Sequence, residues 1–132
     1  PAVKRGKQIF HELGCQGCHT PEHTTGTALI AEFSNQRIWP YTDLLLHDMG
    51  DGLADDRPSG TASGREWKTP PLWGLGLMKK AVGHTRFLHD GRARNLEEAV
   101  LWHGGEAQDS VSGFKALTLT NREDLLEFLG DL

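Results

Sequence analysis

Residues 15 to 19 read CQGCH, and this run holds both cysteines of the chain. Cysteines at positions i and i+3 stand on one helical turn, and a histidine follows the second of them directly. In c-type haem proteins this pattern lets two cysteine sulfurs bond the macrocycle while the histidine binds the iron. The motif therefore predicts one covalently attached haem c, held by Cys15, Cys18 and His19.

Three other uses of a cysteine pair explain the motif less well. A structural zinc site takes four nitrogen or sulfur ligands, usually from two paired clusters, and the chain has only two cysteines. A thioredoxin-type dithiol follows a strand in a βαβ pattern, whereas a helical pattern precedes this motif. A disulfide between Cys15 and Cys18 would leave His19 without a role. Haem attachment is therefore our interpretation of the motif.

The second axial ligand decides what a haem iron can do, because methionine there favours electron transfer and an open position permits peroxide chemistry. We favour Met49 as the iron ligand opposite His19, since it lies in the turn DMGDG, where glycines let the backbone approach a large group. Met78 comes second, because the lysines beside it draw that segment towards water. The other candidates are His47, His84 and His89, whereas we interpret His11, His23 and His103 as surface residues.

Apolar side chains from the irregular parts of the sequence could cover a haem, which is large, flat and mostly apolar. We expect Trp73 and Phe87 among these contacts. The full set is Trp39, Trp67, Leu72, Trp73, Leu75, Leu77 and Phe87. Arg92 could pair with a haem propionate, since guanidinium groups bind carboxylates well. The alternative for the apolar side chains is an ordinary core. The alternative for Arg92 is an ordinary turn that leads into the next helix. An acidic cluster at residues 48–56 lacks the spacing of a calcium loop, so we interpret it as solvated.

The elements that position these residues are predicted to be helices. Apolar residues recur at helical spacing in residues 2–14, 95–104 and 120–132, and more briefly in 40–50. Asn95 is the expected cap of its helix and Gly104 its left-handed exit, while Thr120 and Glu123 fit a capping box. Because strand-like alternation is weak throughout the chain, we predict an all-α domain.

Length and composition fit one domain over residues 1–132, long enough for a single core. The formal net charge is −4, with acidic and basic residues mixed along the chain, which argues against a nucleic-acid-binding protein. No apolar run approaches the roughly 20 residues of a membrane span. The chain begins at Pro1 without a methionine, so we expect a processed protein or a domain cut from a longer one. Residues 50–66 are polar and turn-rich, which indicates a long loop.

Four segments carry a further signal when they are taken together. They are CQGCHTPE, YTDLLLHDMGDGLAD, WKTPPLWGLG and FLHDGRARNLEEAVLWHGGEA, in this order. The set resembles the C-terminal haem domain of the bacterial di-haem oxidoreductases, or thiol oxidoreductases, which are related to di-haem cytochrome c peroxidases. The resemblance implies a cytochrome c-type fold, with helices around one haem, long haem-covering loops and Met49 as the distal ligand. This chain has one haem motif, so the two-haem peroxidase mechanism cannot operate within it.

These observations predict a monohaem c-type cytochrome domain that exchanges electrons with a redox partner protein. The alternative is a haem peroxidase domain, in which a histidine such as His47 or His89 moves protons. A third interpretation is a structural haem in a scaffold whose active site lies elsewhere. Haem attachment of this kind is completed outside the cytoplasm, so we expect a periplasmic or extracellular location. By analogy with cytochrome modules of secreted proteins that act on polysaccharides, the partner could be a copper oxidase or monooxygenase.

Overall fold

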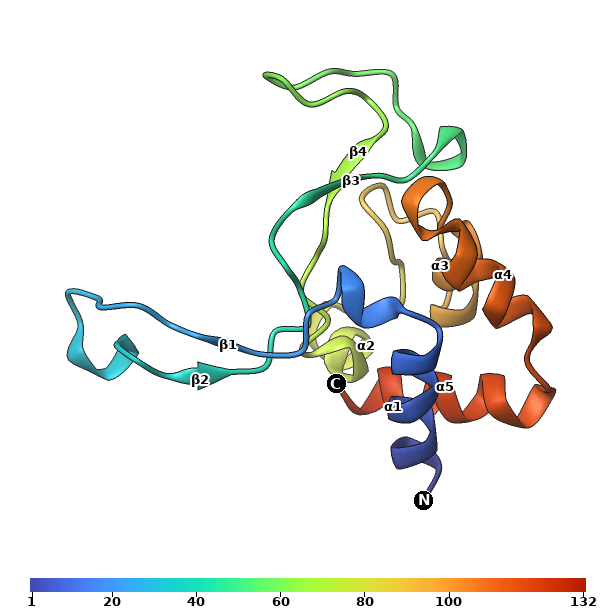
Figure 1. Cartoon of the computed structure of the whole chain (residues 1–132), viewed down its shortest axis with the longest axis horizontal. Coiled ribbons are helices and arrows are strands. Elements are labelled where there is room, and N and C mark those ends of the chain that lie inside the picture. Colours follow the sequence, from blue (N-terminus) through green and yellow to red (C-terminus); the bar gives the residue numbers. More distant parts are fainter.

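The computed structural model describes all 132 residues of the chain. Its five helices are α1 (Ala2–Glu12), α2 (Met78–Val82), α3 (Leu96–Trp102), α4 (Gln108–Ala116) and α5 (Leu119–Asp131). Its four short strands form two separate antiparallel pairs, β1 (His23–Thr24) with β2 (Arg37–Ile38) and β3 (Leu46–Asp48) with β4 (Glu66–Lys68). Figure 1 shows the helices gathered on one side, while the two strand pairs extend away from them in different directions.

The prediction of an all-α cytochrome c-type fold is wrong, because the structure mixes short helices with two small antiparallel sheets. The error lies in residues 40–50, which were expected to form a helix. Tyr41 and Leu44 have φ angles of 55° and 65°, which no right-handed helix accommodates. The segment runs extended instead, and β3 pairs with β4 so that His47 lies opposite Trp67. A short apolar run such as LLL fits either element, and here the cross-strand partner decides.

The helices predicted in residues 2–14, 95–104 and 120–132 are confirmed as α1, α3 and α5, with changes at their ends. Asn95 caps α3, since its side chain accepts a hydrogen bond from the backbone N–H of Glu98 at 2.8 Å. The expected left-handed exit at Gly104 is wrong, because its φ is −151°. The cap of α5 is Thr118 rather than Thr120. The sequence interpretation missed α4 and α2, since α4 has a glycine inside it and α2 has only five residues.

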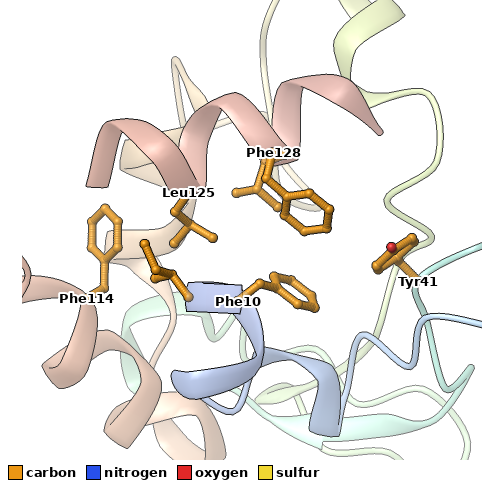
Figure 2. Close-up of a cluster of buried hydrophobic side chains, with 7 residues drawn as sticks. Phe10, Tyr41, Phe114, Leu125 and Phe128 are labelled. Carbon is orange, nitrogen blue, oxygen red and sulfur yellow. The ribbon is translucent and has the colours of Figure 1, made fainter. Parts of the chain in front are cut away.

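The core lies where α1 crosses α5. Gly6 makes the close approach possible, because a Cβ at this position would collide with the backbone carbonyl of Asp124. The Asp124 carboxylate accepts two hydrogen bonds from Arg5, at 2.6 and 2.7 Å, across the same crossing. The buried apolar cluster around it consists of Ile9, Phe10, Tyr41, Phe114, Leu125, Phe128 and Leu129. Figure 2 shows Phe10 and Phe128 between the two helices, with Tyr41 entering from the segment that follows β2.

Outside this core, large apolar side chains are exposed, and most of them come from the segments between α1 and α3. The exposed set is Leu29, Ile30, Phe33, Trp39, Leu44, Leu45, Leu46, Trp73, Leu77, Val82, Leu101, Trp102 and Leu119. We call α1, α4 and α5 the helical base, residues 20–39 the first arm and residues 44–68 the second arm (Figure 1). None of the helices has both the length and the apolar character that crossing a bilayer requires.

Candidate functional site

The two cysteines lie just after α1, around a 3₁₀ turn at Cys15–Gly17. Both are free thiols and both are partly buried. Burial raises the pKa of the Cys15 thiol to about 11, so this sulfur is neutral at ordinary pH. A backbone hydrogen bond closes the turn, because the carbonyl of Cys15 accepts from the N–H of His19 at 2.9 Å. One short turn therefore carries both sulfurs and the imidazole.

His19 is held through one ring nitrogen only. Its Nδ1 lies 3.1 Å from the backbone carbonyl of Tyr41, which requires Nδ1 to carry the proton and leaves Nε2 with a free lone pair. Burial is the main reason why the pKa of His19 falls to about 4, so the ring is neutral. A neutral imidazole whose far nitrogen donates to a carbonyl is the usual form of a metal-binding histidine.

The Tyr41 carbonyl reaches His19 because of an uncommon backbone conformation. Tyr41 is 5% exposed and has a φ of 55°, a left-handed conformation that non-glycine residues adopt at some energetic cost. Its ring packs edge-on against Phe10 and Phe128 with centroids 5.9 Å away in both cases. The aromatic core therefore fixes a strained residue whose main chain orients His19.

The chain segment after Tyr41 runs alongside the cysteine turn. The N–H of Thr42 donates to the carbonyl of Thr20 at 3.0 Å, and the N–H of Asp43 donates to the carbonyl of Cys18 at 2.8 Å. The Thr42 hydroxyl donates in turn to the carbonyl of Thr69 at 2.6 Å. These bonds connect three of the segments that the sequence analysis singled out.

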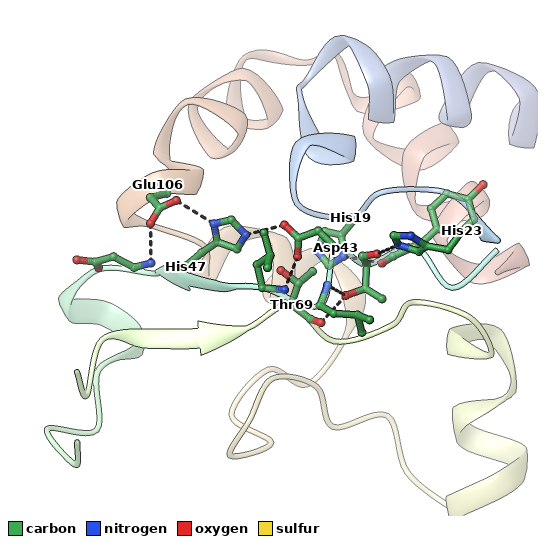
Figure 3. Close-up of polar contacts among 11 residues, drawn as sticks. His19, His23, Asp43, His47, Thr69 and Glu106 are labelled. Atoms are coloured by element: carbon green, nitrogen blue, oxygen red, sulfur yellow. Dashed lines mark hydrogen bonds and ion pairs between the residues drawn. The ribbon is translucent and has the colours of Figure 1, made fainter. Parts of the chain in front are cut away.

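A second histidine, His47 in β3, has both ring nitrogens bonded to carboxylates. Nε2 lies 2.8 Å from Asp43 and Nδ1 lies 2.8 Å from Glu106, as Figure 3 shows. The hydrogen bond to Glu106, followed by that to Asp43, raises the pKa of His47, so the ring tends to be protonated. The bond to His47 is the main reason why the pKa of Glu106 is lowered. His47 therefore favours the protonated form more than a free histidine does, and it lies close to the cysteine turn.

Cys18, Asp43 and His47 also form the one group of metal-donor side chains that the structure brings together, with their ligand atoms within 4.8 Å of one another. A thiolate, a carboxylate and an imidazole suit a transition metal. The nitrogens of His47 are already bonded to two carboxylates, however, and a sulfur bound in a thioether is no longer a thiolate. This cluster would compete with haem attachment for Cys18.

The predicted second ligand, Met49, follows β3 and is partly buried. Its backbone N–H donates to the carbonyl of Arg65 at 3.0 Å, and its own carbonyl lies against Gly104. A bond from its sulfur to iron stays a prediction. Among the other candidates, His89 stacks on Trp67 with centroids 3.5 Å apart, whereas His84 is exposed and Met78 begins α2.

The predicted haem contacts are spread over several places. Arg92 already pairs with Asp90 at 2.7 Å, and its guanidinium lies 5.0 Å from the ring centroid of Trp102. Trp73 is exposed, and Phe87 lines an open groove with Leu75, Leu96 and Leu126. Contacts of Arg92, Trp73 and Phe87 with a haem stay predictions.

The sequence analysis placed His103 on the surface, but the structure places it, like His23, in a partly buried position. His103 follows α3 and is partly buried, its Nδ1 lies 2.7 Å from the carbonyl of Ala99, and burial lowers its pKa. Its ring centroid lies 6.4 Å from that of His19. A signal for burial was present in the sequence, because position 103 continues the inner stripe of Leu96, Ala99 and Val100 at helical spacing.

The donor set on this face fits a covalently attached haem. Two thiols stand on one turn, and the adjacent histidine is neutral with its Nε2 free. The exposed leucines at 44–46 directly follow Thr42 and Asp43, which bond to the cysteine turn. They offer apolar surface that a flat, mostly apolar ring could cover.

Comparison with known proteins gives one match. A family model described as "Di-haem oxidoreductase, putative peroxidase" matches residues 1–132. No curated protein matches the chain, and neither does any solved structure.

Proposed function

The chain belongs to the di-haem oxidoreductase family, and we propose that it carries one haem c, attached through Cys15 and Cys18, and exchanges electrons with a redox partner protein. The membership supports a haem-linked redox function. Single attachment, the thioether bonds and electron transfer in preference to peroxide reduction are our proposal.

The observation that carries the proposal is the environment of His19. A neutral imidazole beside two thiols, with Nδ1 bonded to the Tyr41 carbonyl and Nε2 free, is prepared to bind iron without losing a proton. Haem, when bound, supplies one-electron exchange between ferrous and ferric iron. The chain's part is to hold the ring, orient the axial imidazole and keep water away from it.

The His47 cluster would adjust the electrostatics of that site. Protonated His47 between two carboxylates gives the cluster a net charge of −1, and Asp43 is hydrogen-bonded through its backbone to Cys18. A nearby negative charge stabilises the more positive oxidised state of a metal centre. We therefore expect the cluster to lower the reduction potential.

The partner and the location extend this proposal. Covalent haem attachment is completed in oxidising compartments outside the cytoplasm, which supports a periplasmic or extracellular protein. Electron-transfer partners meet over small contact areas, so the chain needs no large interface of its own. We propose a redox protein as the partner, with a secreted copper oxidase or monooxygenase as the candidate class by analogy.

A peroxidase is the second candidate, and the description of the family model supports it directly. A histidine between two carboxylates near the haem motif, such as His47, is a group that can move protons. Peroxide reduction requires an open or displaceable axial position on the iron. Ligation therefore separates the two candidates.

The test is to express the chain in a host that matures c-type cytochromes and to measure its intact mass. We expect the mass of the polypeptide plus one haem, and a Cys15→Ser/Cys18→Ser variant without added mass as the control. Absorption spectra of both oxidation states, cyanide binding and peroxide turnover then follow. Slow cyanide binding and negligible turnover support electron transfer, whereas fast binding with turnover supports the peroxidase. Bare polypeptide from the maturing host would refute both candidates.

A further inference from the structure

We propose that His103 is the second axial ligand of the haem iron, opposite His19. This inference rests on the proposed function, since it presupposes that a haem is bound at the cysteine turn. It replaces Met49, which the sequence analysis favoured, by a residue that the sequence analysis placed on the surface.

The two histidines present the same chemistry. In each ring Nδ1 lies within hydrogen-bond distance of a backbone carbonyl, that of Tyr41 for His19 and that of Ala99 for His103. Each Nε2 is left without a hydrogen-bond partner. Neither nitrogen belongs to the fully covered polar atoms that lack a partner, so protein does not seal them off. A neutral imidazole nitrogen that is open in this way can bind a metal ion without losing a proton.

The distance between the rings fits one shared metal ion. The centroids of His19 and His103 lie 6.4 Å apart, and their planes are inclined by 52°. Two imidazoles that bind one ion through Nε2, with metal–nitrogen bonds of about 2 Å, have centroids roughly 6 to 6.5 Å apart. Direct packing of two aromatic rings also covers this range. The matching Nδ1 hydrogen bonds and the free Nε2 atoms favour ligation over packing.

The surroundings hold His103 from both sides. Asn95 caps the start of α3, and His103 bonds back to the last turn of that helix. On the other side, Gly105 packs so closely on the carbonyl of Asp48 that a Cβ would collide with it. Glu106 then accepts a hydrogen bond from the N–H of Asp48 at 2.9 Å. A histidine on a helix end that is fixed in this way suits a permanent ligand.

The same contacts place the backbone of Met49 next to the loop that carries His103. Its carbonyl lies against Gly104, the residue directly after His103. The turn that contains Met49 therefore packs against the chain segment that directly follows His103. With two imidazoles on the iron, no position remains open for peroxide, and the potential is lower than a histidine–methionine pair gives. Ligation by His103 thus favours electron transfer over the peroxidase.

The first test uses the unaltered holoprotein. Electron paramagnetic resonance and near-infrared magnetic circular dichroism of the ferric form distinguish two nitrogen ligands from one nitrogen and one sulfur. We expect the low-spin signature of two imidazoles and no sulfur-to-iron charge-transfer absorption. A methionine signature or a high-spin, five-coordinate iron would overturn the proposal.

Variants provide the second test. His103→Met is expected to produce the sulfur-to-iron absorption and to raise the potential, and His103→Ala to give an open iron whose ferrous form binds carbon monoxide at least about tenfold faster. Met49→Leu should keep the two-imidazole spectrum, and His11→Gln, an exposed residue of α1, is the matched control. A changed ligand signature in Met49→Leu with none in His103→Met would refute the proposal.

The two levels fail in different ways. If the mass shows no haem, the proposed function fails before any ligand is compared. If the haem is attached and its spectrum shows sulfur, the proposed function stands and only the assignment of His103 falls. Should His103→Ala not accumulate, the spectrum of the unaltered protein still decides between the ligands.

Discussion

The helical base and the two arms are stabilised by different means. In the base, α1 and α5 bury Phe10, Leu125 and Phe128 against each other, and Phe114 joins them from α4. In the arms, short strand pairs provide backbone hydrogen bonds while large apolar side chains stay exposed. A two-stranded pair is marginally stable by itself in water. The base can therefore fold on its own packing, whereas the arms depend on what they attach to.

The second arm is attached to the rest of the molecule at defined points, which include the stack of Trp67 on His89. His47 bonds to Glu106 beyond the end of α3, and the turn after β3 packs on Gly104 and Gly105. A bound haem would add apolar contacts for the exposed leucines that lie just before His47. The comparison teaches that the cofactor's structural contribution should concentrate in the arms, and the predictions below test that division.

The largest effect is expected at the crossing in the base. Gly6→Ala places a methyl group against the carbonyl of Asp124, so α1 and α5 must move apart. Overpacking of this kind should lower the free energy of unfolding by about 3 kcal/mol. The matched control is Gly130→Ala in α5, where nothing lies within 4 Å of the added atom. Chemical denaturation followed by circular dichroism measures both, and equal stabilities would contradict the packing described for the base.

The next effect separates the arms from the base. The Cys15→Ser/Cys18→Ser variant cannot attach haem, so we expect trypsin to cut it in the arms, at Arg37, Arg65 and Lys68, at least about tenfold faster than the holoprotein. Cleavage in the base, at Lys7 and Lys115, should change little. Mass spectrometry of a digestion time course identifies the sites. If both forms lose the arms at the same rate, the haem contributes nothing to their order.

A smaller effect is expected where α3 joins the base to the proposed ligand. Asn95→Ala removes the side-chain oxygen that accepts the N–H of Glu98 at 2.8 Å, which costs about 1 kcal/mol. Asn95→Asp keeps an acceptor and serves as the control. Thermal unfolding of the holoprotein should fall for the first variant and stay close to the parent for the second. A loss of the same size in both would show that the cap is not the cause.

The smallest effect concerns the ionic link between the second arm and the base. Because the folded-state pKa of His47 is raised, its contribution is fully present below the unfolded value of 6.5 and is lost as the pH rises through the folded value. The pKa of Glu106 is lowered, so its contribution is present above 4.5 and is lost on acidification. The link should therefore stabilise the protein most between these values, and only weakly, because the Glu106 carboxylate is exposed and screened by water. Compared with the parent, His47→Gln should show a flatter decline above pH 6.5, measured by denaturation of the holoprotein; parallel curves would contradict the link.

Sequence patterns predicted the base better than the arms, and the reason is physical. In α1 and α5 the apolar spacing and the helix are local, so residues within one window determine them. In the segment from Tyr41 to Asp48, the outcome depends on a strand partner near Trp67 and on two left-handed residues, and neither feature can be predicted from the residues of the segment alone. The CQGCH motif is local as well, so its prediction needs no knowledge of distant contacts. His103 was missed because its significance lies in the distance to a residue 84 positions earlier.

Tyr41 links the aromatic core to the proposed haem site. Its ring packs against Phe10 and Phe128, while its main-chain oxygen accepts a hydrogen bond from the imidazole of His19. Loosening the aromatic cluster should therefore release that imidazole at the same moment. In the holoprotein, the visible absorption of the haem would then report on the packing of the aromatic core. Thermal unfolding followed by haem absorption and by far-ultraviolet circular dichroism should therefore give coinciding curves.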